Sequence, residues 1–91
     1  MADIEGLARL TIDCALQIHE DVGPGLVESV YEAILASSLL KLGIKADRQV
    51  PIGIEYAGLV FAEGFRADLL VDDRLIVEVK SVDRLMPVHA R

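Results

Sequence analysis

The stretch FRADLLVDDRLIVEVKS, residues 65–81, carries the clearest structural signal in the chain. Its apolar residues fall mainly on odd positions on both sides of a break at residues 72–74, and most of its charged residues fall on even positions. Side chains of a strand point alternately to two faces, so each segment has one apolar and one charged face. The break, Asp72-Asp73-Arg74, is typical of a turn. The pattern therefore predicts a β-hairpin.

The same pattern predicts the register of this hairpin. The apolar sets share a face only if odd residues pair with odd residues, as Val71 with Leu75, across an odd-numbered loop. That register places Asp68 opposite Glu78 on the charged face. Two carboxylates in this position repel each other, so a cation is expected between them. Alternatively, both are solvated on an open sheet face, with Lys80 as their counter-ion.

Length and composition limit the class of protein. The chain has 91 residues, of which 53% are hydrophobic, so one small ordered domain is expected. No apolar run approaches about 20 residues and no secretory signal is present, so we expect a cytoplasmic protein. The single cysteine, Cys14, excludes an internal disulfide. The net charge of −6 argues against a general nucleic-acid binder but suits a carboxylate site for a divalent metal ion.

Two helices are predicted before the strands. The first runs from residue 4 to about residue 21, with Asp3 as its N-cap, and it ends at the Gly-Pro-Gly of residues 23–25. The second covers residues 26–42 and is closed by Gly43. The apolar stripe of the second helix is wide, which predicts a helix covered on more than one side.

Two charged residues of these helices have competing interpretations. His19 lies in the last turn of the first helix, where a histidine is more often a C-terminal charge or a capping donor than a ligand. Glu28 lies in the first turn of the second helix, where the helix dipole favours a carboxylate without any site role. Glu32, four residues later, places a like charge on the same flank.

From residue 44 the pattern changes to that of strands. Residues 49–56 alternate, and Pro51 within them predicts an edge strand or a bend. Ala57-Gly58 turns the chain, residues 59–63 add a short strand or a loop, and Pro87 suits the first turn of another helix. The order of elements predicts an α+β fold, in which two N-terminal helices pack on a small, mainly antiparallel sheet with a central hairpin.

Several other kinds of site are excluded by the sequence. The Gly-Pro-Gly segment lacks the lysine of a P-loop and does not follow a strand. The two histidines do not have the spacing of zinc ligands. The two tyrosines and two phenylalanines are too few and too scattered to form a base-stacking platform.

Several motifs taken together resemble one known family. The string HEDVGPGLVESVYEAIL contains Gly25, Glu28 and Tyr31 in a GxxExxY arrangement, and RQVPIGIEYAG, FRADLLVDD and IVEVKSV follow it. From about residue 7 to the C-terminus, the chain is similar to the GxxExxY protein family of the PD-(D/E)xK nuclease-like superfamily. An Asp, a nine-residue gap and then Glu-x-Lys make this combination more specific than GxxExxY alone.

The resemblance implies a magnesium-dependent or manganese-dependent nuclease, which hydrolyses phosphodiester bonds of DNA or RNA on a restriction-endonuclease-like core. The acidic pair and the lysine of the superfamily fall on Asp68, Glu78 and Lys80, and its helix glutamate falls on Glu28. Asp68, Glu78 and the Val79 carbonyl would hold the metal ion. Lys80 would orient or deprotonate the attacking water, or stabilise charge.

The resemblance also bears on the residues that line the site and on the extent of the domain. His19, Tyr31 and Gln49 match family positions and are expected to line the site. Family members usually continue past the Glu-x-Lys strand with a helix and at least one more strand, whereas this chain ends at Arg91. We therefore expect residues 1–91 to form a single, C-terminally truncated domain, or one that completes its core as a homo-oligomer. A non-catalytic, self-associating module on the same scaffold is the alternative function.

Overall fold

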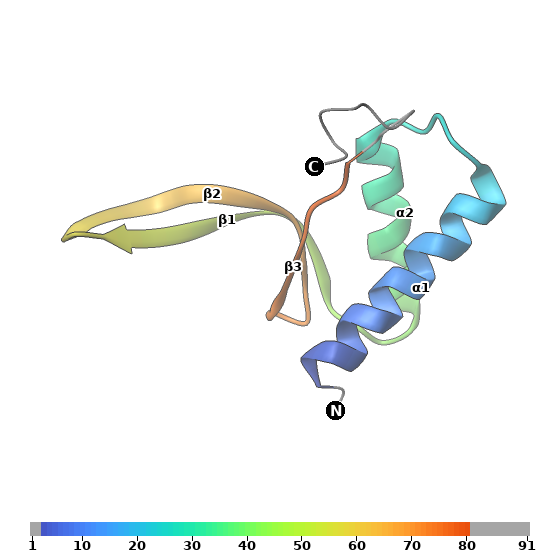
Figure 1. The fold of residues 1–91 in the computed structure, drawn as a ribbon, viewed down its shortest axis with the longest axis horizontal. Coiled ribbons are helices and arrows are strands. Elements are labelled where there is room, and N and C mark those ends of the chain that lie inside the picture. The colour runs from blue at the N-terminus through green and yellow to red at the C-terminus, as the bar shows by residue number, and fades with distance from the viewer. Residues whose placement is uncertain (1–2, 81–91) are drawn as a thin grey trace, which may run out of the picture.

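The computed structural model of the chain describes residues 3–80, which form two helices followed by a three-stranded antiparallel sheet (Figure 1). The elements are α1 (Ile4–Val22), α2 (Glu28–Lys41), β1 (Ala46–Tyr56), β2 (Leu59–Val71) and β3 (Leu75–Val77). The strands lie in the order β1-β2-β3. This architecture confirms the predicted α+β fold. The helix expected near Pro87 lies outside the described residues.

The first helix begins and ends close to where the sequence predicts. The Asp3 carboxylate accepts a hydrogen bond from the Gly6 N–H at 2.7 Å, which satisfies one of the donors that a helix start leaves unpaired. Gly23 ends the helix with a φ of 71°, and its N–H donates to the His19 carbonyl at 2.8 Å. A glycine suits this position because positive φ is strained for residues with a Cβ atom.

The second helix is shorter and less covered than the sequence predicts. It begins at Glu28 rather than at Leu26, because Val27 keeps an extended backbone as the N-cap, with a ψ of 146°. Cover on more than one side was predicted for its wide apolar stripe, but Val27, Val30 and Leu42 are exposed. The packing of α1 and the sheet against α2 leaves that part of the stripe open.

The core lies where the two helices meet the inner part of the sheet. It is built from buried apolar side chains of both helices and of the strands: Leu7, Ile18, Leu35, Ala36, Leu39, Ala46, Leu69 and Val71. The Tyr31 hydroxyl of α2 donates to the Ala15 carbonyl of α1 at 2.6 Å, which fixes the two helices together. Ala67, Leu69 and Val71 of β2 are fully buried, as the parity of the sequence predicts, whereas Phe65, expected on the same face, is 43% exposed.

The loop between β2 and β3 has the register that the sequence predicts. Val71 pairs with Leu75, and Leu69 pairs with Val77, so odd residues face odd residues across residues 72–74. The two aspartates of this loop have φ values of 54° and 58°. Aspartate tolerates this left-handed region better than most residues do, because its short side chain can hydrogen-bond locally.

The last strand is shorter than predicted. β3 ends at Val77, so the expected pairing of Asp68 with Glu78 falls one step beyond the last pair of the ladder. The direct opposition of these two residues within the ladder was therefore a wrong prediction. The physical reason is a different hydrogen bond: the Val79 N–H donates to Oδ2 of the Asp68 side chain, at 2.8 Å, rather than to a backbone carbonyl of β2.

The strands β1 and β2 form a long hairpin that projects away from the helices (Figure 1). Tyr56 pairs with Leu59 across Ala57 and Gly58, whose φ values of 52° and 83° are typical of a type I′ turn. The turn was predicted, but residues 59–63 are not a separate short strand or loop. They continue without a break into the segment that carries Asp68.

The hairpin has two parts with different surroundings. Its inner part, residues 46–52 and 67–71, lies against the helices and holds its buried residues. Its outer part, residues 53–66, is exposed at every position, and we call it the arm. Pro51 lies in β1, which forms an edge of the described sheet, as its proline predicts.

Candidate functional site

Asp68 lies on β2 at the point where the inner part of the hairpin meets β3. Its neighbours Ala67 and Leu69 are fully buried on the core side, so the Asp68 side chain points to the opposite face of the sheet. Its Oδ2 accepts the Val79 N–H at 2.8 Å, and its Oδ1 lies 3.5 Å from Nε2 of Gln49. The carboxylate is therefore contacted by β1 on one side and by the segment after β3 on the other.

Glu78 and Lys80 flank the residue that contacts Asp68. Val79, between them, is only 8% exposed, whereas both flanking residues are exposed. This alternation is that of an extended chain, in which Glu78 and Lys80 point to the face opposite Val79. Because the Val79 N–H is bonded to Asp68, the Glu-x-Lys segment lies directly beside that carboxylate.

The residues that the resemblance places on the helices have different surroundings. Tyr31 uses its hydroxyl in the hydrogen bond to the Ala15 carbonyl, so this group serves helix packing. His19 is exposed in the last turn of α1, where a basic side chain suits the helix dipole. Glu28 is exposed in the first turn of α2. Site roles for His19 and Glu28 stay predictions.

A buried carboxylate that the sequence did not mark as a site residue lies next to Asp68. Glu32 of α2 is 4% exposed, and its carboxylate accepts hydrogen bonds from Arg48 Nε at 3.0 Å and from Gln49 Nε2 at 3.0 and 3.2 Å. Arg48 also donates from Nη2 to the Ser29 carbonyl at 3.2 Å. The buried charge is thus paired with a cation and an amide, and Gln49 connects Glu32 to Asp68.

The helical spacing around Glu32 contained a signal for this network. Leu35, Ala36 and Leu39 follow it at three, four and seven residues, and all three are buried, so Glu32 belongs to the buried stripe of α2. A carboxylate on such a stripe must be paired or hydrogen-bonded, because burying an isolated charge is very costly. The spacing is therefore the signal by which a polar partner from another element could have been predicted.

The donor set at Asp68 matches the chemistry of a hard divalent cation. The residues predicted to bind a metal ion, Asp68, Glu78 and Val79, would offer two carboxylates and one carbonyl, which are oxygen donors of the kind that Mg²⁺ prefers. Within residues 3–80, no group of three or more His, Cys, Asp or Glu side chains is arranged to hold a metal ion. A set with two carboxylates suits the mode in which Mg²⁺ keeps several waters and takes substrate phosphate, rather than a closed protein cage.

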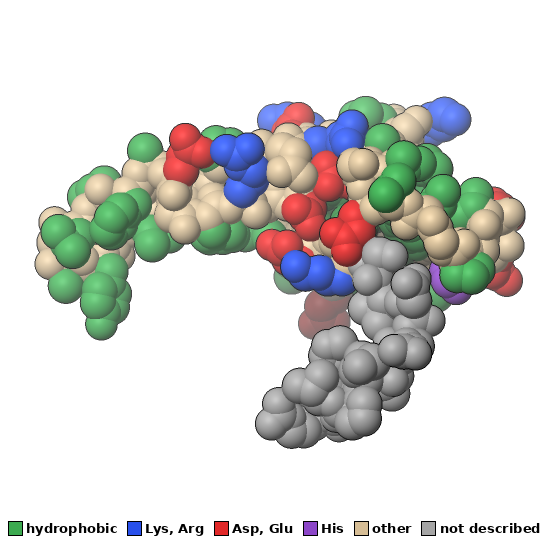
Figure 2. Space-filling model, turned by 90° about the horizontal axis from the view of Figure 1, so that it is seen from above, with side chains coloured by type: hydrophobic (Ala, Val, Ile, Leu, Met, Phe, Trp, Pro, Cys, Tyr) green, Lys and Arg blue, Asp and Glu red, His purple; other side chains and the backbone are tan. Residues whose placement is uncertain are grey.

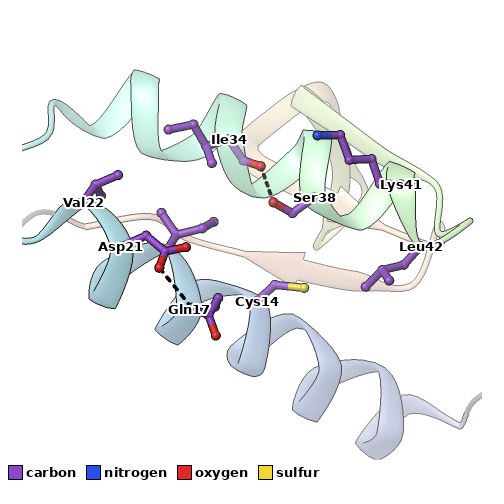
Figure 3. Close-up of a pocket in the computed structure, with 9 residues that line it drawn as sticks. Cys14, Gln17, Asp21, Val22, Ile34, Ser38, Lys41 and Leu42 are labelled. Atoms are coloured by element: carbon purple, nitrogen blue, oxygen red, sulfur yellow. Dashed lines mark hydrogen bonds between the residues drawn. The ribbon is translucent and has the colours of Figure 1, made fainter.

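A separate hollow of about 350 Å³ lies between α1 and α2 (Figure 3). Its lining residues are Cys14, Gln17, Ile18, Asp21, Val22, Ile34, Ser38, Lys41 and Leu42. Three of its polar side chains, Gln17, Asp21 and Ser38, are already hydrogen-bonded, since Gln17 donates to Asp21 at 3.1 Å and Ser38 donates to the Ile34 carbonyl at 2.9 Å. None of the residues around Asp68 lines the hollow, so it is not the candidate site.

Comparison with known proteins supports a nuclease-like assignment. A model described as the PD-(D/E)XK nuclease superfamily matches residues 5–91. The chain belongs to this superfamily. Nucleases of the superfamily generally use divalent metal ions, which agrees with the oxygen donors around Asp68. No curated protein and no solved structure matches the chain.

The length and apolar character of the two described helices bear on whether either could span a membrane. Within residues 3–80, neither helix combines the length and the apolar character that a span across a lipid bilayer requires.

Proposed function

We propose that this superfamily member is a GxxExxY-type nuclease, which uses Mg²⁺ or Mn²⁺ to hydrolyse phosphodiester bonds of DNA or RNA. The observation that carries the proposal is the 2.8 Å hydrogen bond from the Val79 N–H to Asp68 Oδ2. It holds the acidic residue of β2 against the middle of the Glu-x-Lys segment. Membership of the superfamily supports the reaction class.

Each residue of the candidate site has a proposed role. Asp68, Glu78 and the Val79 carbonyl bind the metal ion, which when bound lowers the pKa of a coordinated water and offsets negative charge on the phosphate. Lys80 orients or deprotonates the attacking water, or stabilises the developing charge. Glu28, at the start of α2, supplies a further carboxylate at the edge of the site.

A cleavage assay with several DNA and RNA forms, in Mg²⁺ or Mn²⁺, tests the proposal. We expect cleavage by the wild type and a loss of about 100-fold or more in rate for Glu78→Gln or Lys80→Met. Glu63→Gln is the matched control, because Glu63 is an exposed carboxylate of the arm that pairs only with Arg66 among the described contacts. Its rate should match that of the wild type.

Metal binding gives an independent test of the same proposal. Calorimetry should show uptake of Mn²⁺ by the wild type and no uptake by Asp68→Asn, which loses one of the two carboxylate ligands. The Glu63→Gln control should bind Mn²⁺ as the wild type does. The proposal is rejected if the wild type takes up neither Mn²⁺ nor Mg²⁺.

The exposed arm supports a second candidate function, a non-catalytic module that self-associates into a homo-oligomer. Figure 2 shows hydrophobic side chains gathered at the far end of the arm. The large exposed apolar residues there and along the arm are Ile54, Tyr56, Leu59, Val60, Phe61 and Phe65. Ile54, Tyr56, Leu59 and Phe61 share one face of the arm and are between 41% and 77% exposed, so one copy offers roughly 500 Å² of apolar surface there. Two copies would approach the roughly 1,200 Å² of a small specific interface.

The oligomeric state tests this second candidate. Light scattering coupled to size-exclusion chromatography should give the mass of a dimer for the wild type and of a monomer for Leu59→Asp, because a charge in the contact would be left unpaired. Ile12→Asp is the control, since Ile12 is exposed on α1, away from the arm. A wild type that elutes as a monomer at high concentration would rule out the module. Cleavage that is lost in Lys80→Met would rule out the non-catalytic interpretation.

A further inference from the structure

Gln49 has a backbone conformation that is unusual for its place in a strand. It lies within β1 with a φ of 52°, between Arg48 and Val50, which pair with Leu69 and Ala67 of β2 in an unbroken register. Positive φ costs a residue with a side chain about 1–2 kcal/mol, and glutamine is not among the residues that tolerate it best. Contacts of the surrounding structure must offset this cost.

The strained residue allows two neighbouring side chains to reach one carboxylate. Arg48 Nε and Gln49 Nε2 both donate to Glu32. Neighbouring residues of a regular strand point to opposite faces of the sheet, so both could not contact the same side chain. The left-handed conformation of Gln49 breaks the alternation at this point of β1.

The amide of Gln49 spans two carboxylates. Its Nε2 donates to both oxygens of Glu32, at 3.0 and 3.2 Å, and lies 3.5 Å from Oδ1 of Asp68. Ionised carboxylates only accept hydrogen bonds, so the NH₂ group, and not the amide oxygen, must face them. One N–H can serve Glu32 while the other is directed at Asp68.

Glu32 gives this amide a fixed anchor. The Glu32 side chain is buried in α2, beside core residues Leu35 and Leu39, and Arg48 holds it from the other side at 3.0 Å. A buried and doubly bonded carboxylate has little freedom to move. Glu32 therefore holds the Gln49 amide in place. The Asp68 carboxylate, which the same amide contacts, is held in place with it.

We propose that Gln49 is a positioning residue for Asp68. It contacts Asp68 Oδ1 while the Val79 N–H holds Oδ2, so the carboxylate keeps one orientation before any metal ion binds. The inference rests on the proposed function, in which Asp68 is a metal ligand. Glu32 acts on Asp68 indirectly, because it holds the Gln49 amide in place.

Two glycine substitutions separate the side chain of Gln49 from its backbone strain. Gln49→Gly removes the amide and relieves the positive φ. Ala57→Gly is the matched control, because Ala57 has the same φ of 52° but lies in the turn of the arm, away from Asp68. Gln49→Leu is the second variant: it keeps the strained backbone and a side chain of similar size but has no donor. Both Gln49 variants should behave alike if the amide is what matters.

The first readout needs no metal ion. Amide hydrogen exchange of Val79, followed by NMR, reports the bond from its N–H to Asp68. We expect exchange about fivefold faster in Gln49→Gly and Gln49→Leu, because a loosely held carboxylate is a poorer acceptor, and no change in Ala57→Gly. Wild-type exchange of Val79 in both folded Gln49 variants would overturn the inference.

The second readout is the affinity for Mn²⁺, measured by calorimetry. Loss of a residue that orients a metal ligand should weaken binding about tenfold in both Gln49 variants and leave Ala57→Gly unchanged. Equal affinity of the wild type and the Gln49 variants would contradict the positioning role. If the wild type binds no Mn²⁺, the proposed function fails, while the exchange of Val79 still decides whether Gln49 positions Asp68.

Discussion

The inner part of the β1–β2 hairpin and the arm belong to the same pair of strands, yet only the inner part is folded into a core. In the inner part, Ala67, Leu69 and Val71 are fully buried, and Asp68 faces the candidate site between them. In the arm, residues 53–66 are exposed at every position although many of them are apolar. Strand pairing and burial are therefore separate properties, and the helices decide which part of the ladder is buried.

The polar contacts of the two parts differ in the same way. In the inner part, Arg48 pairs with Glu32, whose side chain is 5% exposed. In the arm, Arg66 pairs with Glu63 at 2.9 Å, and both side chains are more than half exposed. An ion pair in water is screened and contributes little, whereas removal of the arginine that pairs with a buried carboxylate leaves a costly uncompensated charge.

Truncation of one apolar side chain in each part tests this difference most strongly. Leu69→Ala should lower the free energy of unfolding by about 3 kcal/mol, because Leu69 is fully buried and the change leaves a cavity. Val60→Ala should lower it by less than about 0.5 kcal/mol, since Val60 is 75% exposed. Urea titrations of the two variants give both values. Similar losses would show that the arm is packed in solution.

Removal of one arginine from each part should give a smaller but still clear contrast. We expect Arg48→Ala to cost about 2 kcal/mol, because the buried Glu32 carboxylate would keep only the Gln49 amide as its partner. Arg66→Ala should cost less than about 0.5 kcal/mol. Urea titration again measures both. A stable Arg48→Ala variant would mean that water replaces the guanidinium at Glu32.

The fold and the inner register were predictable because both depend on local patterns. The helix signals near Asp3 and Gly43 and the parity around Val71 and Leu75 each act within a few residues of the chain. The extent of the arm was not predictable in this way. Alternation of apolar residues looks the same whether or not a helix lies over the strand, and only the tertiary packing decides the cover.

The candidate site was predictable only in part. Asp68 and the Glu-x-Lys segment were found by their spacing and resemblance, because a strand ladder converts that spacing into proximity. The contacts of Gln49 depend on a positive φ in the middle of β1, which no propensity of glutamine would indicate. Glu32 was recognisable as a charge on a helix flank, but its partners come from residues 16 and 17 positions away in the sequence.

The turn of the arm offers a test of how independent the two parts are. Ala57→Asn should stabilise the turn by about 0.5 kcal/mol, because asparagine tolerates the φ of 52° and Asn-Gly is a preferred type I′ pair. The arm packs on nothing else among the described residues, so it is expected to open locally. Amide exchange within residues 53–61 should slow, while the urea midpoint stays that of the wild type. A shift of the midpoint would instead show that unfolding of the arm is coupled to unfolding of the core.

The smallest expected effect concerns the inner end of the hairpin, where Lys45 joins the start of β1 to the loop after β2. Its Nζ lies 3.0 Å from Asp73 Oδ1 and 3.6 Å from Asp47 Oδ2. The hydrogen bond to Asp73, followed by the charges of Asp73 and Asp47, raises the pKa of Lys45 above its ordinary value of 10.5. A pKa raised by folding means that the contribution to stability is fully present below pH 10.5 and is lost as the pH rises through the higher value.

The difference in stability between the wild type and Lys45→Met should show this pH dependence. The wild type should be slightly more stable at about pH 8, where the lysine is charged in both the folded and the unfolded chain. As the pH rises, the advantage should shrink in strongly alkaline solution, once Lys45 loses its proton in the folded state. It should also shrink at high salt, because all three side chains are largely exposed. Urea titrations across this range measure the difference, and an advantage that grows with pH would contradict the assigned pairing.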